Sequence, residues 1–523
     1  MKNEVVYMTN FWNCVTNFYT DNFCTDKYWT DHNSHSWCSP VKRAPVARFT
    51  ALQHVITFAI LMFPVNTLAH VSEQGLVLLL PTDFYIMSGV LVVILTLLVV
   101  ILLPATLSVK LFRSARLSSL KQVDNSRLQI ATSLLSLFVL TVLLIVGYTG
   151  TSDPLENLLP LVIWTLWWVG LPILQGLIGD IWQWLNPWIG IYRIARQAGW
   201  RTPFSLPNRV AYWPGVLLFL LFISFALADV APDVPRRLSL FVGGYWCFNL
   251  LCLMLVGEQW LKKGECFSML MHRFSQLSPM GVSKSGHNNQ SLRFGLPGWK
   301  LMDSKANSIS AAIFILVLLG CGSFDGLNET FTWLSMIGIN PLEFPGRSAV
   351  IKETVTGLLA TNLLLILVYG LCVYAGVYYC DRSLNSNQRV GFITAFCALA
   401  ISVLPIAYAY HFAHFLVTLL VNGQYTIAAA SDPLHTGANL LNLKPYFVTT
   451  GFMNTHETVE IIWLTQAAAV VTGHVISVLL AHAVAVELYG NARRAIVSQV
   501  PLAVFMVGYT FIGLWLLAAP KGA

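Results

Sequence analysis

Two histidines, His411 and His414, stand three residues apart in the apolar stretch 390–421. On a helix this spacing places both imidazoles on one face, where two ring nitrogens can bind one metal ion. Polar groups at membrane depth are energetically expensive, so such residues are candidate functional groups. The alternative is a pair of interfacial histidines hydrogen-bonded to backbone or water. The spacing leaves both interpretations open.

A third histidine, His474, lies in the apolar stretch 459–484 beside small residues four apart, Gly473, Ser477 and Ala481. This pattern is typical of closely packed membrane helices. We expect His474 to lie well inside the bilayer, where it must find a polar partner. It is either a hydrogen-bonding residue of the packing face or a proton relay or metal ligand.

Carboxylates and further histidines occupy the loops that we expect outside the membrane. Asp325 lies in Gly322-Ser323-Phe324-Asp325-Gly326, and Asp432 lies in Ser431-Asp432-Pro433-Leu434-His435. Asp-Gly and Asp-Pro usually form turns, but a shared side of the membrane would let these carboxylates meet the histidines. We therefore take Asp325 and Asp432 as candidate catalytic residues, and His70, His411, His414 and His474 as candidate metal ligands.

The composition is that of a multi-pass membrane protein. The chain has 523 residues, of which 56% are hydrophobic and 11% are charged, and its mean hydropathy is +0.65. Soluble domains carry about 25% charged residues, so a soluble enzyme and a disordered chain are both excluded. The ten cysteines form no CxxC pair, and no basic block is dense enough to indicate nucleic-acid binding.

The N-terminal region is predicted to be an extension followed by a secretory signal. Residues 1–40 are polar and show no hydrophobic period, which favours a start codon assigned too far upstream. In 41–69, basic residues precede a short apolar run and the small-residue ending Thr67-Leu68-Ala69, as in a cleaved signal peptide. Cleavage would make His70 the first residue of a membrane domain 70–523, with its amine and ring able to chelate copper. An uncleaved first helix is the alternative.

Ten apolar stretches of about 20 residues follow. They are 84–104, 129–149, 158–179, 212–230, 239–257, 308–322, 354–379, 390–421, 459–484 and 500–519. Alternate loops between them contain twenty Lys and Arg residues, whereas the other loops and the mature termini contain six. This asymmetry predicts that the mature N-terminus and the C-terminus both lie outside.

Two of the loops on the basic side carry further structure. Trp182, Trp184 and Trp188 precede a stretch with Arg193 and Arg196, a pattern that indicates an amphipathic helix lying at the membrane surface. The segment 258–307 is expected to be a loop with one amphipathic piece between Phe267 and Phe274. We see no internal repeat, which argues against a transporter built from inverted halves.

Several segments match a pattern known from one family. The matching stretches are Ala69-His70, Leu185-Asn186-Pro187-Trp188, Ser323-Phe324-Asp325-Gly326, Ala407-Tyr408-Ala409-Tyr410-His411-Phe412-Ala413-His414, Gly423-Gln424, Ser431-Asp432-Pro433, Gly473-His474 and Gly508-Tyr509-Thr510. They resemble the bacterial multi-pass membrane proteins known as fenitrothion hydrolases. The resemblance implies a bacterial inner-membrane protein that hydrolyses organophosphorus triesters. Ala481-His482-Ala483 departs from the pattern, which has an acidic residue after the histidine, and residues 1–40 have no counterpart.

Two functions of different class follow. As an enzyme, the protein would use a divalent metal, copper or zinc, to activate water against a lipophilic substrate that arrives from the bilayer. His411 and His414 would bind the metal, and His70, Asp325, Asp432 or His435 would complete its shell. As a non-enzyme, the same groups would bind or pass a metal ion or small solute, with His474 as a station midway. A carrier needs a polar path inward past His474, and the few polar residues in the inner halves of the spans favour an external site.

Overall fold

The computed structural model describes most of the chain after residue 79. The described residues are 80–121, 125–207, 209–284, 289–303, 308–343, 346–381, 389–444, 446–453 and 455–520. The extension 1–40, the signal segment 41–69 and His70 lie outside these ranges. The predictions for cleavage and for an N-terminal chelate therefore remain predictions.

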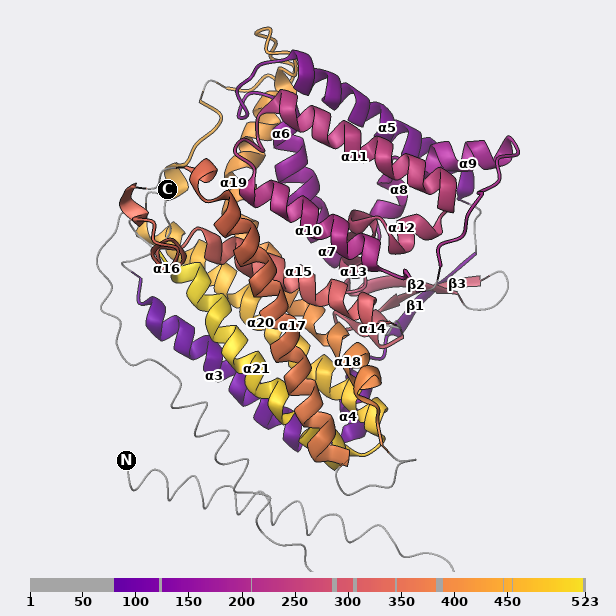
Figure 1. Cartoon of the computed structure of the whole chain (residues 1–523), viewed down its shortest axis with the longest axis vertical. Helices are drawn as coiled ribbons and strands as arrows, with labels where there is room; N and C mark the ends of the chain where they lie inside the picture. The colour runs from indigo at the N-terminus through magenta and orange to yellow at the C-terminus, as the bar shows by residue number, and fades with distance from the viewer. Residues whose placement is uncertain are drawn as a thin grey trace, which may run out of the picture. The chain divides into compact units, whose positions relative to one another are not determined.

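Ten apolar helical segments build the described part of the chain, which confirms the predicted all-α membrane architecture (Figure 1). Nine of these are long and apolar enough to cross a membrane, and α10 is shorter. A hydrocarbon core of about 30 Å requires about 20 helical residues, and each segment matches one predicted stretch. In order they are α3 (Thr82–Leu102), α5 (Ser126–Thr149), α6 (Leu158–Leu161) with η2 (Val162–Gly170) and α7 (Leu171–Ile178), α10 (Trp213–Ala228), α11 (Pro235–Val256), α15 (Ile309–Asn328), α17 (Ile351–Asp381), α18 (Phe392–Ala400) with η6 (Ile401–Val403) and α19 (Leu404–Ser431), α20 (His456–Tyr489) and α21 (Ala492–Ala518).

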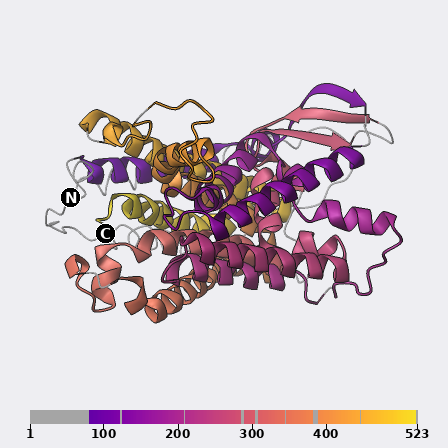
Figure 2. The ribbon, with the colours of Figure 1, turned by 90° about the horizontal axis from the view of Figure 1, so that it is seen from above.

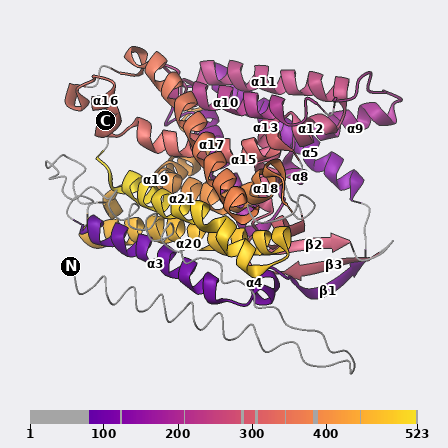
Figure 3. The same cartoon turned by 60° about the horizontal axis from the view of Figure 1, so that its bottom comes forward.

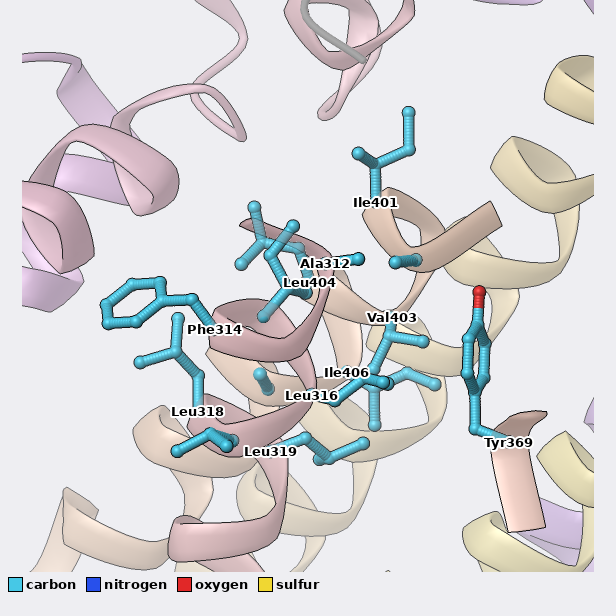
Figure 4. Close-up of a cluster of buried hydrophobic side chains, with 14 of the residues drawn as sticks. Ala312, Phe314, Leu316, Leu318, Leu319, Tyr369, Ile401, Val403, Leu404 and Ile406 are labelled. Atoms are coloured by element: carbon cyan, nitrogen blue, oxygen red, sulfur yellow. The ribbon is translucent and has the colours of Figure 1, made fainter. Parts of the chain in front are cut away.

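Helix α15 lies at the centre of the packing. It contacts α10, α17, α18 and α19, while α3, α17, α20 and α21 run side by side (Figures 1 and 3). Figure 4 shows its buried Phe314, Leu318 and Leu319 in one cluster with side chains of α19 and η6. Between membrane helices, close packing rather than exclusion of water provides the stability. Gly320 allows this closeness, because a Cβ there would lie 2.4 Å from Asn362 Oδ1 of α17.

The eighth segment is broken near its start. Helix α18 ends at Ala400, the three-residue 3-10 turn η6 follows, and α19 begins at Leu404 with Pro405 as its second residue. Proline has no N–H and fits the first turn of a helix. The break therefore falls just before Pro405, and prolines are common sites of kinks in helices. Helix α19 then continues to Ser431, ten residues beyond the predicted end of this span.

A small antiparallel sheet corrects the prediction of a loop at 258–307. This segment forms α12 (Gln259–Lys263), α13 (Cys266–Ser275), β2 (Met280–Lys284), β3 (Asn289–Phe294) and α14 (Trp299–Asp303). Strand β3 pairs with β2 on one side and with β1 (Ala115–Lys121) on the other, as neighbouring arrows in Figure 2 show. Strand β1 comes from a distant loop, so the local sequence could not reveal its pairing with β3. Both loops belong to the basic set, consistent with their sharing one side of the membrane.

The tryptophan-rich segment contains the predicted amphipathic helix, but two of its tryptophan rings are buried in the protein. Helices α8 (Trp182–Leu185) and α9 (Ile189–Gln197) follow α7, but Trp182 and Trp188 are only 6% and 3% exposed. The Trp182 indole N–H donates to Ser268 Oγ, and that of Trp188 donates to the Trp246 carbonyl, each at 2.9 Å. These two rings therefore belong to the protein core rather than to the headgroup layer.

The remaining short elements connect the spans. They are α4 (Ala105–Leu111), α16 (Phe331–Met336), η3 (Pro341–Glu343), η4 (Arg347–Ala349) and η7 (Gly451–Met453).

Candidate functional site

Asp325 and His414 form a pair between α15 and α19. Asp325 Oδ2 lies 3.2 Å from His414 Nε2, and the two side chains are 17% and 9% exposed. The prediction of an external turn at Asp325-Gly326 is wrong, because α15 continues to Asn328 and holds Asp325 inside its last two turns. Packing against α19 outweighs the turn preference of this dipeptide, and it brings the carboxylate to the imidazole.

Glycines on either side of Asp325 make room for Tyr410 of α19. A Cβ at Gly326 would lie 2.0 Å from the Tyr410 hydroxyl oxygen, whereas one at Gly322 would lie 3.4 Å from Tyr410 Cδ1. The Tyr410 ring stacks on His414 with centroids 5.8 Å apart and planes 13° apart. Gly326 thus makes room for the Tyr410 hydroxyl, and the Tyr410 ring packs on the imidazole that faces Asp325.

His411 lies one helical turn before His414 and faces aromatic rings. Its ring packs edge-on to Trp168 of η2 at 5.4 Å, to Phe415 at 4.9 Å and to Phe274 of α13 at 6.0 Å. Its Nε2 atom is buried and has no hydrogen-bond partner among the described residues, and the same is true of the Tyr410 hydroxyl. An enclosed polar atom of this kind is costly, so both atoms are poised to bind a small polar guest.

These groups line one small cavity of about 30 Å³. Asp325, Tyr410, His411 and His414 contribute its polar groups, Cys321 lies beside them, and the other walls are apolar. A cavity needs roughly 10–15 Å³ and two to four polar partners to hold one water molecule. The site therefore has the size and the polar groups for a water molecule or a single ion, and it is too small for a drug-sized organic molecule.

A second polar contact joins this region to α21. Ser323 of α15 lies with its Oγ 2.5 Å from the Tyr509 hydroxyl, and it also donates to the Leu319 carbonyl. Ser323 and Tyr509 thereby fix the end of α15 that carries Asp325.

The structure does not bring Asp432 to this cavity. Asp432 follows the end of α19, eighteen residues after His414, which is roughly 27 Å along a helix. Its carboxylate accepts hydrogen bonds from the backbone N–H groups of Thr436 and Gly437 at 2.9 and 2.7 Å. These bonds lower the pKa of Asp432. Asp432 therefore closes a turn, and His435 in that turn faces Glu156 at 3.5 Å.

His411 and His414 lie further from the end of their span than the predicted end at residue 421 implies. They fall in the middle of the helical segment from Phe392 to Ser431, because the helix runs on through the polar residues Asn422 and Gln424. Both rings line the same cavity, as the prediction that they share one helix face requires.

His474 occupies a separate place, inside the contact of α20 with α19. It is 1% exposed, its Nδ1 lies 2.9 Å from the Val470 carbonyl oxygen, and its buried Nε2 has no partner among the described residues. The neighbouring Gly473 would place a Cβ 2.4 Å from Ala409 Cβ, and Ser477 Oγ donates to the Ser402 carbonyl. The predicted packing face of small residues is therefore confirmed.

The residues do not form a three-ligand metal shell. Among the residues that the structure describes, no group of three or more His, Cys, Asp or Glu side chains is arranged to hold one metal ion. Asp325 and His414 are close enough to act as two ligands, and His411 contributes a ring to the same cavity.

Tyr410 and Trp168 are parts of the site that sequence reasoning did not single out. Tyr410 precedes His411 directly and stands four residues before His414, so its helical spacing was a usable signal. Trp168 had none, because its place beside His411 depends on the π-helix η2 packing against α19. Long π-helical stretches are rare and often occur at functional sites.

The fold and this site together define a multi-pass α-helical membrane protein with a buried Asp–His pair. Comparison of the chain with known protein families, with curated proteins and with solved structures finds no match.

Proposed function

We propose that the protein is a membrane hydrolase of uncharged lipophilic esters, in which Asp325 and His414 activate a water molecule. The pair at 3.2 Å beside a water-sized cavity carries this proposal. A carboxylate that accepts a hydrogen bond from one imidazole nitrogen orients the ring and leaves the other nitrogen free to take a proton. The resemblance to fenitrothion hydrolases supports the substrate class, organophosphorus triesters.

The chemical step assigns a role to each atom of the pair. Asp325 Oδ2 accepts a hydrogen bond from His414 Nε2–H, so His414 Nδ1 receives a proton from the water as its oxygen bonds to phosphorus. The bond from phosphorus to the leaving oxygen breaks, and His414 returns the proton to that oxygen. The products are a phosphodiester and an alcohol or phenol. Tyr410 and His411 are positioned to hydrogen-bond the water or the phosphoryl oxygen.

The direct test is turnover of a 4-nitrophenyl dialkyl phosphotriester by the purified protein in lipid nanodiscs. We expect Asp325→Asn and His414→Ala to lower kcat/KM by about 10²-fold or more, as loss of a general base does. Asp432→Asn is the matched control, because Asp432 lies in a turn away from the cavity, and it should keep full activity. Absence of turnover by the wild-type protein, or full activity of Asp325→Asn, would overturn the proposal.

Binding of a cation by the same pair is the second candidate function. Two ligands that are each about 2.1 Å from one metal lie roughly 3.0–3.4 Å apart, and the Asp325–His414 separation of 3.2 Å falls in this range. A copper or zinc ion would need a third ligand, which His411 could supply after a change of rotamer. Metal analysis of the purified protein tests this function. Cation binding would be favoured if the wild-type protein retained one copper or zinc ion per chain and His411→Ala lost it. A metal-free wild-type protein would exclude this function.

The membrane topology completes the proposal. The resemblance and the distribution of Lys and Arg support a bacterial inner-membrane protein with both mature termini on the outer side. A lipophilic ester partitions into the bilayer, so its route to the Asp–His pair is sideways from the lipid rather than through water.

A further inference from the structure

A second, much larger cavity lies between α5, the α6–η2–α7 segment, α10 and α11. Its volume is about 550 Å³, which is within the range of about 300–1,000 Å³ that small-molecule sites occupy. We call it the lateral chamber. The chamber is about eighteen times larger than the cavity at His414, so it can hold an organic molecule where that cavity cannot.

The wall chemistry of the lateral chamber specifies its guest. None of its 25 lining residues is Asp, Glu, Lys, Arg or His, and ten of the 25 are Trp, Phe or Tyr. An ion would lose its hydration here without compensation, so the guest must be uncharged. A wall so rich in rings favours a guest that itself contains rings, because aromatic pairs gain energy beyond the burial of their area.

One buried carboxylate lies close by, and the fold turns it away from the chamber. Tyr245 lines the chamber, and its hydroxyl donates to Glu265. Glu265 is fully buried at the start of α13, where it accepts hydrogen bonds from the backbone N–H groups of Phe267 and Ser268. Burial raises the pKa of Glu265. Glu265 is not part of the lining, so the chamber wall carries no charge near Tyr245.

The chamber opens toward lipid. Its lining includes Leu135 and Val139 of α5 and Leu166 of η2, which are 61%, 47% and 45% exposed. Apolar side chains exposed on a membrane-spanning helix face the bilayer. The exposed part of the wall lies on α5 and η2, and a guest from the bilayer would enter between them.

A layer of aromatic rings separates the chamber from the cavity at His411. Phe222 and Phe267 line the chamber, and Trp168 lines the cavity. The Trp168 centroid lies 4.9 Å from Phe222, 6.4 Å from Phe267 and 5.4 Å from His411. Only one ring thus stands between the chamber wall and the histidine.

We propose that the lateral chamber binds an uncharged, ring-bearing lipophilic molecule that enters from the bilayer. The chamber and its chemistry stand independently of any reaction. If the proposed hydrolysis is also correct, the chamber holds the lipophilic group of the ester, and Trp168 separates that group from the water at His414. This placement of the ester rests on the proposed function.

The test is photoaffinity labelling in nanodiscs with an uncharged naphthyl diazirine, with labelled peptides mapped by mass spectrometry. We expect label on α5, η2 and α11, and at least a tenfold loss of label when excess 2-methylnaphthalene competes. Leu140→Trp fills the chamber from α5 and should reduce labelling by a similar factor. Leu134→Trp is the matched control on the same helix, because Leu134 is not part of the lining, and its labelling should equal that of wild type.

A parallel arm uses a phosphatidylcholine with a diazirine on its acyl chain. Labelling of the same peptides by this lipid, unaffected by 2-methylnaphthalene, would overturn the proposal in favour of an ordinary acyl chain. Equal naphthyl labelling of the Leu140→Trp and Leu134→Trp variants would overturn it as well. Asp325→Asn should label like wild type, so failure of the hydrolysis proposal and failure of the chamber proposal give different results.

Discussion

Gly326 is the residue whose replacement most directly tests the geometry of the Asp–His pair. In Gly326→Ala the new methyl carbon would lie 2.0 Å from the Tyr410 hydroxyl oxygen, whereas ordinary contact begins at 3.4 Å. Tyr410 would have to move by about 1.4 Å, and its ring is stacked on His414. Overpacking of this kind costs about 1–3 kcal/mol.

Gly322→Ala is the matched control, one turn earlier on the same helix. Its methyl carbon would lie 3.4 Å from Tyr410 Cδ1, which is ordinary contact. Both substitutions gain up to about 1 kcal/mol of helix propensity, so this gain cancels in the difference between them. We expect Gly326→Ala to be less stable than Gly322→Ala by about 1–3 kcal/mol, seen as a Tm lower by a few degrees in detergent.

Removal of the Tyr410 hydroxyl tests whether this one oxygen atom causes the destabilisation. With Tyr410→Phe the hydroxyl is gone, and the nearest remaining ring atom lies 3.3 Å from the new methyl carbon. Adding Tyr410→Phe to Gly326→Ala should therefore restore most of the lost stability. A double variant as unstable as Gly326→Ala, or a Gly326→Ala protein as stable as Gly322→Ala, would refute the packing of Tyr410 between Gly322 and Gly326.

A partly buried lysine, the membrane topology and a buried tryptophan each allow one further test. Burial lowers the pKa of Lys300 from 10.5 to about 8, so the unfolded chain binds more protons than the folded chain between these pH values. Stability should therefore rise as pH increases from about 8 to 10.5. Thermal unfolding of Lys300→Met should not show this rise. In a background without reactive cysteines, an impermeant maleimide added from outside should label cysteine at Glu343 or Asp432 and miss cysteine at Ser283; the reverse pattern would invert the topology. Trp182→Phe should lower stability by about 0.5–1.5 kcal/mol through loss of the bond to Ser268, whereas Trp184→Phe, a change at a less buried ring, should have a smaller effect on Tm.

The spans could be predicted from the sequence because their cause is local. Bilayer thickness sets the length of an apolar helix, and this is why ten predicted stretches match ten helical segments. The ends of helices were less predictable. Asp325-Gly326 and Asn422-Gly423-Gln424 look like turns or span ends, yet both lie inside helices whose neighbours hold them.

Asp325, His411 and His414 could be selected from the sequence as single residues, but the contact between Asp325 and His414 could not be predicted. His414 was a polar group in an apolar stretch and Asp325 a carboxylate in a loop expected outside, whereas their contact depends on where α15 crosses α19. The same limit applies to the sheet, since β1 and β3 come from different loops. For Asp432, sidedness suggested proximity, but the length of α19 places it far from His414 along the helix axis.

The two cavities divide between them what hydrolysis of a lipophilic ester requires. Water activation needs a small polar space with a fixed proton acceptor, and the cavity between α15 and α19 has these features. Retention of the ester needs a large uncharged space that the ester can reach from lipid, and the lateral chamber is large and lined without charged side chains. A single large polar pocket that opened to lipid would expose its polar groups to hydrocarbon, at a high cost for every group left without a partner. Under the proposed function, an aromatic partition of Phe222, Phe267 and Trp168 avoids that cost, because it keeps the ester and the water molecule apart until these rings move.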